Sequence, residues 1–306
     1  MIRFIEYKNI DKQKWDRCIQ QSANSSIYVY SWYLDAVCAN WSALVLNDYE
    51  TVFPLAPRSK YTISYLYQPF FTRYFGAFSK RALTEQSVNS LFEAIPHKYK
   101  FIEFAVNETT IFNFPEFSKK ERVYQLLNLN ADYEALYKAY SDNTKRNIKK
   151  AVNTGLVVRS GIEAQKIVDL FKLTKGKELK ELKERDYKSL VQLMETAEKM
   201  KRAESIAVYD KDNTLCAAGF FMKNNSRLTF LKSGVTDQGK NSGAMQFLFD
   251  TIIKKNAETN TVLDFGGSSV ETVARFYKSF GAKDCVYLQL KKNSLPSIVK
   301  WISKKQ

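Results

Sequence analysis

The chain has 306 residues, of which 45% are hydrophobic, and its 47 Lys and Arg outnumber its 32 Asp and Glu. With only 11 glycines and 6 prolines, it is neither a fibrous nor a largely disordered chain. The single histidine, His97, lies in no nucleophile motif, and the four cysteines form no close pair, which excludes a multi-histidine or paired-thiolate metal site. We therefore expect no bound metal.

The N-terminal residues, MIRFIEYKNIDKQKW, interrupt their apolar side chains with charges and lack the apolar core of a signal peptide. No stretch approaches the roughly 18 apolar residues that span a bilayer. The scattered cysteines are typical of buried thiols and not of a disulfide framework. The sequence therefore predicts a cytoplasmic protein without an integral membrane segment. Its length exceeds one ordinary core, so we expect two domains, residues 1–130 and residues 131–306.

Short runs of β-branched and aromatic residues between turn residues predict three strands in the first half, Trp41–Leu46, Thr51–Leu55 and Thr62–Tyr67. A helix near Glu85–Ala94 and a strand at Phe101–Ala105 follow. The aromatic residues around Tyr67 are expected to serve mainly as core.

The middle of the chain is expected to be helical. Apolar residues at helical spacing predict helices over Asp132–Tyr140, Lys145–Asn153, Ala164–Leu182 and Asp186–Met200. Ser141-Asp142-Asn143-Thr144 indicates a break and an N-cap between the first two.

The second half repeats the pattern of the first. Strands are predicted at Ser205–Tyr209, Thr214–Met222 and Arg227–Lys232, then a helix at Ala244–Lys255 and a strand at Thr261–Phe265. Antiparallel strands, a helix and one more strand, occurring twice, predict two copies of one α/β unit.

The segment DFGGSSVETVARFYKSFG, Asp264–Gly281, is the strongest candidate for a site. Gly266 and Gly267 permit positive φ and the close approach of a ligand to the backbone. Ser268 or Ser269 is expected to cap the next helix. A helix N-terminus after a strand suits an anion or a developing oxyanion, although a well-capped turn explains the same residues.

This segment resembles the C-terminal signature of the Fem peptidoglycan aminoacyltransferases, bacterial enzymes of the GNAT-fold superfamily. Asn143–Ala151 with Gly155 is similar to the basic stretch that opens the second domain of that family, and Tyr67–Arg73 with Gly76 to its Q-P segment. The resemblance implies an α/β fold of two tandem GNAT-like domains, each a mixed, largely antiparallel sheet flanked by helices. It also implies transfer of an acyl or aminoacyl group to an amine, with the donor held by the second domain.

The resemblance further implies roles for individual residues. Lys278 corresponds to the signature lysine, which contacts donor phosphate or steadies the reacting carbonyl. Asp264 corresponds to the strand acid, which orients or deprotonates the amine. Both have structural alternatives, Lys278 as a solvated lysine that the helix dipole favours. Tyr67, Gln68 and Arg73 are the expected acceptor-binding residues.

The stretch from Asp237 to Ala244 lies where GNAT enzymes carry the loop that binds the pyrophosphate of CoA, but its spacing is shifted, and a surface turn is the alternative. A second basic stretch, Lys145–Lys150, stacks like charges on one helix, a cost that a phosphate-rich ligand would relieve. The alternative is a solvated basic face over a small core contact. The expected donor-binding residues are Lys145, Arg146, Lys149, Gln238, Gly239, Lys240, Asn241, Ser242, Gly243, Ala244, Gly266, Gly267 and Ser268.

Residues 131–306 carry a net charge of +12 and residues 1–130 only +3, so an anionic partner is expected on the second half. The leading hypothesis is an N-acyltransferase without metal or covalent intermediate, using acyl-CoA or aminoacyl-tRNA as donor. Its acceptor is a cell-wall precursor, an amino sugar or another small amine. The alternatives are a non-catalytic RNA-binding protein of the same fold, which aromatics and cations would support, and an inactive scaffold.

Overall fold

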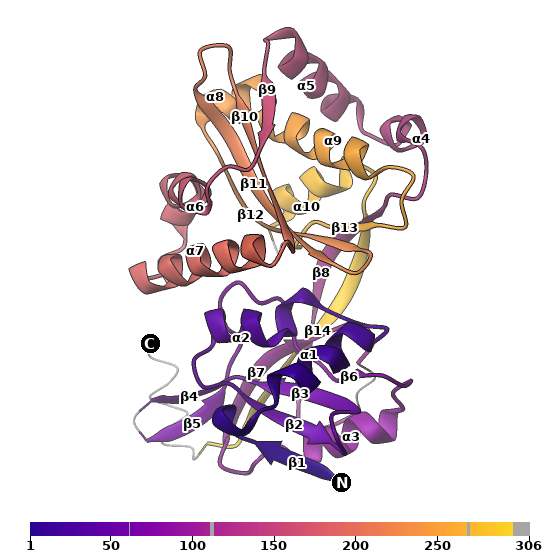
Figure 1. Ribbon diagram of the computed structural model, residues 1–306, viewed down its shortest axis with the longest axis vertical. Coiled ribbons are helices and arrows are strands. Elements are labelled where there is room, and N and C mark those ends of the chain that lie inside the picture. Colours follow the sequence, from indigo (N-terminus) through magenta and orange to yellow (C-terminus); the bar gives the residue numbers. More distant parts are fainter. Residues whose placement is uncertain (61, 111–112, 268–269, 296–306) are drawn as a thin grey trace. The chain divides into compact units, whose positions relative to one another are not determined.

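The computed structural model describes residues 1–60, 62–110, 113–267 and 270–295 (Figure 1). The chain divides into two compact units, one of Met1–Arg122 with Val286–Gln306 and one of Val123–Cys285. The last strand of the described residues, β14 (Lys283–Asn293), pairs antiparallel with β7 (Phe101–Val106), so the chain returns to the first unit along β14. This division differs from the predicted one, in which every residue after 130 belongs to the second domain.

Unit 1 contains two groups of strands. Strands β1 (Ile2–Ile5), β2 (Ser42–Leu46), β3 (Thr51–Leu55) and β6 (Phe78–Ser79) form an antiparallel sheet. Strands β4 (Pro57–Lys60) and β5 (Ile63–Leu66) pair with each other, and β5 pairs parallel with β7. The α-helices are α1 (Lys12–Gln21), α2 (Ser31–Val37) and α3 (Glu85–Glu93), with 3₁₀ turns η1 (Tyr7–Asn9) and η2 (Ile27–Val29).

Unit 2 is built on a sheet in the order β8-β13-β12-β11-β10-β9. Its strands are β8 (Ser118–Asn128, which starts in unit 1), β9 (Val157–Ser160), β10 (Ala203–Tyr209), β11 (Leu215–Asn224), β12 (Arg227–Val235) and β13 (Val262–Asp264). Its helices are α4 (Tyr133–Lys138), α5 (Asp142–Asn153), α6 (Ala164–Leu173), η3 (Lys175–Glu178), α7 (Glu184–Lys199), α8 (Asp237–Ser242), α9 (Ala244–Asn256) and α10 (Glu271–Lys278). Neighbouring strands run antiparallel except β12 and β13, which are parallel.

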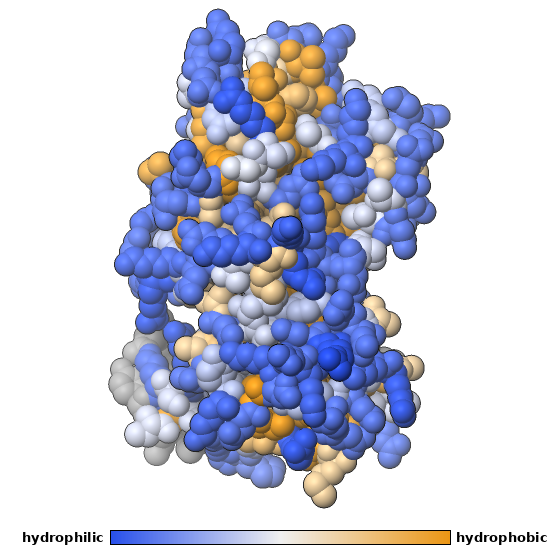
Figure 2. All heavy atoms as spheres, in the orientation of Figure 1, coloured by the Kyte–Doolittle hydropathy of each residue, from blue (hydrophilic) through white to orange (hydrophobic). Residues whose placement is uncertain are grey.

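Helices cover both faces of the unit 2 sheet. Figure 1 shows α6 and α7 on one side of β10 to β12, and α9 and α10 on the other. On the α9 side, Phe230, Phe249 and Phe265 form an aromatic core whose successive ring centroids are 5.0 and 5.1 Å apart. On the α6 side, Gly234 of β12 lets the helix approach, because a Cβ there would lie 2.6 Å from Leu170. On the side of the protein drawn in Figure 2, hydrophilic residues cover most of the surface.

The predicted elements are largely confirmed, including the two series of strands, helix and strand and the α/β fold class. The prediction of one helix over Ala164–Leu182 is wrong. Helix α6 ends at Leu173, and the chain continues as the turn η3. Thr174, which follows α6, has φ −108° and ψ −100°, a conformation that cannot continue the helix. Gly176 in the turn fits beneath Tyr187 of α7, whose hydroxyl lies 3.0 Å from a Cβ built there. In the described part of the chain, no helix is long and apolar enough to cross a membrane.

Candidate functional site

Strand β12 carries a β-bulge at Leu231. Phe230 pairs with Phe221 and Lys232 pairs with Phe220, so Leu231 is an extra residue on this strand. A bulge shifts the alternation of side chains along the strand by one position. Phe230 therefore packs against Phe249 of α9, whereas Lys232 lies over the ring of Phe171 on α6, its Nζ 4.4 Å from the centroid.

Beside this bulge, β12 separates from its parallel neighbour. The two strands pair from Arg227 with Val262 to Thr229 with Asp264. Strand β12 continues to Val235, but β13 ends at Asp264. The chain after β13 turns away from β12 at Gly266 and Gly267, whose φ angles are +83° and +68°. The second half of β12 thus has β11 on one side and an opening on the other.

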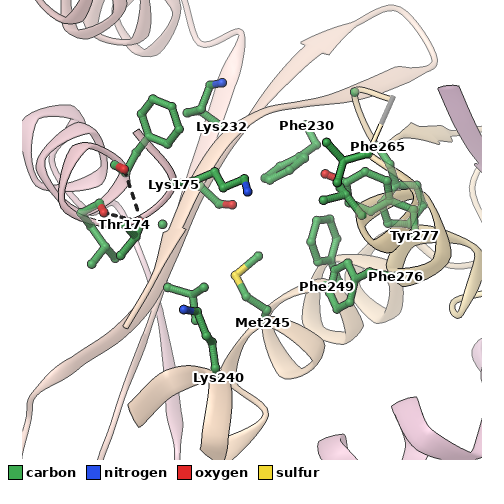
Figure 3. A pocket seen from close by; sticks show the side chains of 18 of the residues that line it. Thr174, Lys175, Phe230, Lys232, Lys240, Met245, Phe249, Phe265, Phe276 and Tyr277 are labelled. Atoms are coloured by element: carbon green, nitrogen blue, oxygen red, sulfur yellow. Dashed lines mark hydrogen bonds between the residues drawn. The ribbon is translucent and has the colours of Figure 1, made fainter. Parts of the chain in front are cut away.

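A cavity of about 980 Å³ fills this opening, here named the β12–β13 cleft. Its lining comes from α6 and η3 on one face of the sheet and from α9 and α10 on the other. Phe249, Phe265, Phe276 and Tyr277 gather on one side of it in Figure 3. Since alternate residues of a strand direct their N–H and C=O groups to opposite sides, some of those beyond Phe230 face the cleft.

Lys232 is the functional candidate that the sequence analysis missed. It is partly buried, lines the cleft, and is labelled in Figure 3. Burial lowers the pKa of its ammonium to about 8. In the sequence it is one more lysine at the expected end of a strand, and only the bulge, which depends on pairing with β11, directs it to this place.

Asp264 does not reach the cleft as a free acid. Its side chain is fully buried, and its Oδ2 lies 3.1 Å from Nε of Arg227. Its Oδ1 accepts a hydrogen bond of 2.9 Å from the N–H of Gly266. Because a Cβ on Gly267 would lie 2.6 Å from Cβ of Tyr124, the turn is packed tightly as well. Asp264 thus holds the Gly266–Gly267 turn, which does line the cleft.

Lys278 lies apart from Asp264, near the end of α10. Its Nζ is 3.1 Å from Oδ2 of Asp284, and both side chains are exposed. The pKa of Asp284 is lowered by a hydrogen bond from Gln125 and also by Lys278. The described lining of the cleft includes Phe276 and Tyr277 of the same helix but not Lys278. Ser268, the other predicted residue of this segment, lies outside the described residues.

The predicted phosphate loop is mostly helical. Gln238, Gly239, Lys240, Asn241 and Ser242 form α8, which Thr236 caps by accepting a hydrogen bond from the N–H of Gly239. Their backbone donors are partly used within this helix. Gly243, with φ +78°, joins α8 to Ala244, the first residue of α9.

Within this stretch the side chain closest to the expected role is Lys240, which lines the cleft and pairs with Asp237 at 2.8 Å. Gln238 instead donates to Asp210.

The predicted basic stretch lies elsewhere in unit 2. Arg146 and Lys149 are exposed on α5, and Lys145 donates to the carbonyl of Lys138. Lys149 lines a second hollow of about 690 Å³, together with Tyr133 and other residues of α4 and α9. These cations therefore do not share the β12–β13 cleft with Lys240.

The predicted acceptor residues have structural partners inside unit 1. The side-chain oxygen of Gln68 accepts a hydrogen bond of 2.8 Å from the N–H of Ala105 on β7. Arg73 is 9% exposed and donates to the hydroxyl of Tyr28 at 3.1 Å. The guanidinium of Arg58 lies 4.9 Å from the ring centroid of Tyr67, and burial raises the pKa of that tyrosine.

No protein-family model matches the sequence, and no curated protein does. Solved structures do match. FemX has a TM-score of 0.67 at 13% identity, over 97% of this chain and 99% of that one. A tandem GNAT protein from the clavulanic acid biosynthesis pathway has a TM-score of 0.57 at 10% identity, over 97% and 100%. The C-terminal domain of a putative lysylphosphatidylglycerol synthetase from Agrobacterium fabrum has a TM-score of 0.55 at 10% identity, over 92% and 91%.

At these identities the likeness is one of fold. The chain has the fold of a tandem GNAT protein and of FemX, and this confirms the predicted fold and its resemblance to Fem-like proteins.

Proposed function

We propose that the chain is an N-acyltransferase, which moves an acyl or aminoacyl group from an activated donor to an amine in the β12–β13 cleft. The observation that carries this proposal is the separation of β12 and β13 beside the bulge at Leu231, because it leaves a cavity against an open strand edge. The fold it shares with a tandem GNAT protein agrees with this function.

The open edge of β12 supplies what an acyl transfer needs. When an amine attacks a thioester or ester carbonyl, negative charge develops on the carbonyl oxygen, and fixed N–H donors stabilise it. Backbone N–H groups of β12 beyond Phe230 are held in place by the sheet, so they need no reorganisation. The aromatic walls of the cleft limit water, which protects the activated donor from hydrolysis.

The donor is proposed to enter with its anionic part near α8 and α9. Lys240 lies at this side of the cleft, and the N-terminus of the 13-residue helix α9 begins at Ala244. Both favour phosphate. Acyl-CoA and aminoacyl-tRNA satisfy this chemistry equally, and a cell-wall precursor, an amino sugar or another small amine would serve as acceptor. Lys278 is retained as a residue that contacts the donor, and Asp264 as the residue that positions the turn at Gly266.

A thermal-shift titration tests donor binding. Acetyl-CoA, longer acyl-CoAs and an alanyl-RNA minihelix are compared with free CoA and uncharged RNA. A donor at 100 times its Kd is expected to stabilise the fold by about 2.7 kcal/mol. If neither class of donor raises the melting temperature, the proposal is wrong.

A variant that fills the cleft tests its location. Met245 lines the cleft, and Met245→Trp is expected to abolish the thermal shift by occupying the space of the donor. Met200→Trp is the matched control, because Met200 is 46% exposed and lies at the end of α7. This variant should bind the donor with wild-type affinity. Equal donor affinity in both variants would place the donor elsewhere.

RNA binding without catalysis is a second candidate, favoured by the hollow beside α5. Tyr133 and Tyr137 line it, with Nζ of Lys254 5.0 Å from the first ring and Nζ of Lys145 5.8 Å from the second. Stacking on aromatic rings and contacts from lysines are the means by which single-stranded RNA is held. This candidate predicts RNA affinity that falls steeply with salt, that Lys149→Gln weakens, and that occurs without acyl transfer.

A further inference from the structure

The bulge at Leu231 decides which side of the sheet Lys232 occupies. Without the extra residue, position 232 would share the face of Phe230, which packs in the aromatic core with Phe249. With it, Lys232 faces α6 and lies one residue from the bulge, at the open edge of β12. Bulges of this kind often direct a side chain into a site.

The side chain of Lys232 packs against an aromatic ring of α6. Its Nζ lies 4.4 Å from the centroid of Phe171, and burial is what lowers its pKa to about 8. A lysine with its ordinary pKa of 10.5 is almost fully protonated at neutral pH, whereas one near 8 has a usable neutral fraction.

The other ionisable groups of the described cleft lining come from η3, α8 and α10. Lys175 pairs with Glu178 on η3, and Asp237 pairs with Lys240 on α8. Tyr277 of α10 completes the set. Since each of the two carboxylates has a lysine partner of its own, neither takes the place of a base next to Lys232.

Acyl transfer to an amine requires a base. The acceptor arrives as an ammonium ion at neutral pH and has no lone pair until it loses a proton. The acid that the sequence suggested for this step, Asp264, is fully buried and paired with Arg227. The cleft therefore offers the amine of Lys232 in its place.

We propose that Lys232 is the group that accepts the proton of the acceptor ammonium, so that the amine can attack the donor carbonyl at the open edge of β12. This role rests on the proposed acyl transfer. The N–H bond of the ammonium breaks and its proton goes to Nζ of Lys232. The freed lone pair forms the C–N bond, and the C–S or C–O bond of the donor breaks. The leaving sulfur or oxygen takes a second proton from the attacking nitrogen, and Lys232 returns its proton to water.

The first measurement is the pH dependence of turnover with acetyl-CoA or the alanyl-RNA minihelix, whichever binds, and ethylamine as acceptor, because the ammonium of a simple alkylamine does not itself titrate near pH 8. Wild-type kcat/KM should rise with pH through an inflection near 8. Lys232→Met should lower it about 100-fold at pH 7.5 and remove the inflection. Lys232→Arg, which keeps the charge but does not titrate, should behave like Lys232→Met. Lys211→Met, in an exposed turn outside the described cleft lining, should match wild type.

Full rate with an unchanged inflection in Lys232→Arg would overturn the role, because it would show that only the charge is needed. Donor binding measured by thermal shift should be the same in Lys232→Met and wild type. Turnover whose pH profile ignores Lys232 would therefore overturn this role alone, whereas absence of donor binding in wild type would overturn the acyl transfer itself.

The second measurement is independent of turnover. Lysine side-chain NMR of the full chain, with Lys232→Met used to assign the signal, should show Lys232 titrating between about pH 7 and 9. Titration near the ordinary lysine value would overturn the proposal whatever the enzyme assays show.

Discussion

The two units differ at the strand edge that continues beyond their parallel strand pair. In unit 1, β5 pairs parallel with β7 at Tyr65 with Phe101 and at Leu66 with Ile102, as β12 pairs with β13 in unit 2. Beyond this point the chain of unit 1 returns to β7. The N–H of Phe75 donates to the carbonyl of Ala105, and the carbonyl of Phe75 accepts from the N–H of Asn107, just after β7. The side-chain oxygen of Gln68 accepts from the N–H of Ala105. In unit 2 the strand that extends past the parallel pairing is β12, and its edge borders a cavity.

The two strand edges differ in where their backbone groups find partners. Backbone polar groups at the edge of a strand need partners, from the protein or from a ligand and water. Unit 1 supplies them from its own residues, so Gln68 acts as a structural residue there. Unit 2 leaves β12 open beside a cavity and fixes the adjacent turn with Asp264.

The largest expected effect comes from removing Asp264, the residue that holds the open arrangement of unit 2. Asp264→Ala leaves the mostly buried guanidinium of Arg227 without its carboxylate, which should cost about 3–5 kcal/mol of unfolding free energy. Urea unfolding measures it. The double variant Asp264→Ala with Arg227→Met should recover part of the loss, and a loss below about 1 kcal/mol in the single variant would contradict the structural role.

Lys232→Met should stabilise the protein at neutral pH. The folded pKa of Lys232, about 8, is below its ordinary value of 10.5, so folding disfavours the charged form. As pH falls from 10.5 to 8 the unfolded chain takes up a proton that the folded chain does not, and wild type loses stability; below 8 the penalty is complete. Methionine carries no charge and avoids this penalty, so the substitution should raise the free energy of unfolding at neutral pH by about 1–3 kcal/mol. Urea midpoints of both proteins at pH 7 and pH 11 measure the difference, and an equal difference at both pH values would contradict the assigned pKa.

Gln68 provides the matching test in unit 1. Gln68→Ala leaves the N–H of Ala105 without its acceptor and should cost about 1–3 kcal/mol. Donor binding and turnover should be unchanged in the fraction that is folded. A loss of acceptor affinity without loss of stability would instead restore the role that the sequence suggested for this residue.

The smallest effect on stability is expected at Lys278, where an exposed ion pair with Asp284 contributes under about 1 kcal/mol. Lys278→Ala should melt like wild type. If Lys278 contacts the donor, kcat/KM will fall in this variant while the pH inflection assigned to Lys232 persists. An unchanged rate would remove Lys278 from the site.

Most of the helices and strands, and their repetition, could be predicted from the amino-acid sequence. Short β-branched and aromatic runs marked β10 and β11, helical spacing marked α9, and two adjacent glycines marked the turn after β13. These features depend on residues close together in the chain, whose hydrogen bonds and side-chain periodicity are local.

Tertiary structure decided the chemistry of the site. The bulge at Leu231 exists only in the pairing of β12 with β11, and it is this pairing that turns Lys232 away from the core. The burial of Asp264 depends on Arg227, a residue of another strand, and the role of Gln68 depends on β7. Strand register, burial and ion pairs join residues far apart in the sequence, so local pattern could suggest an acid and a lysine but not which of them meets the cleft.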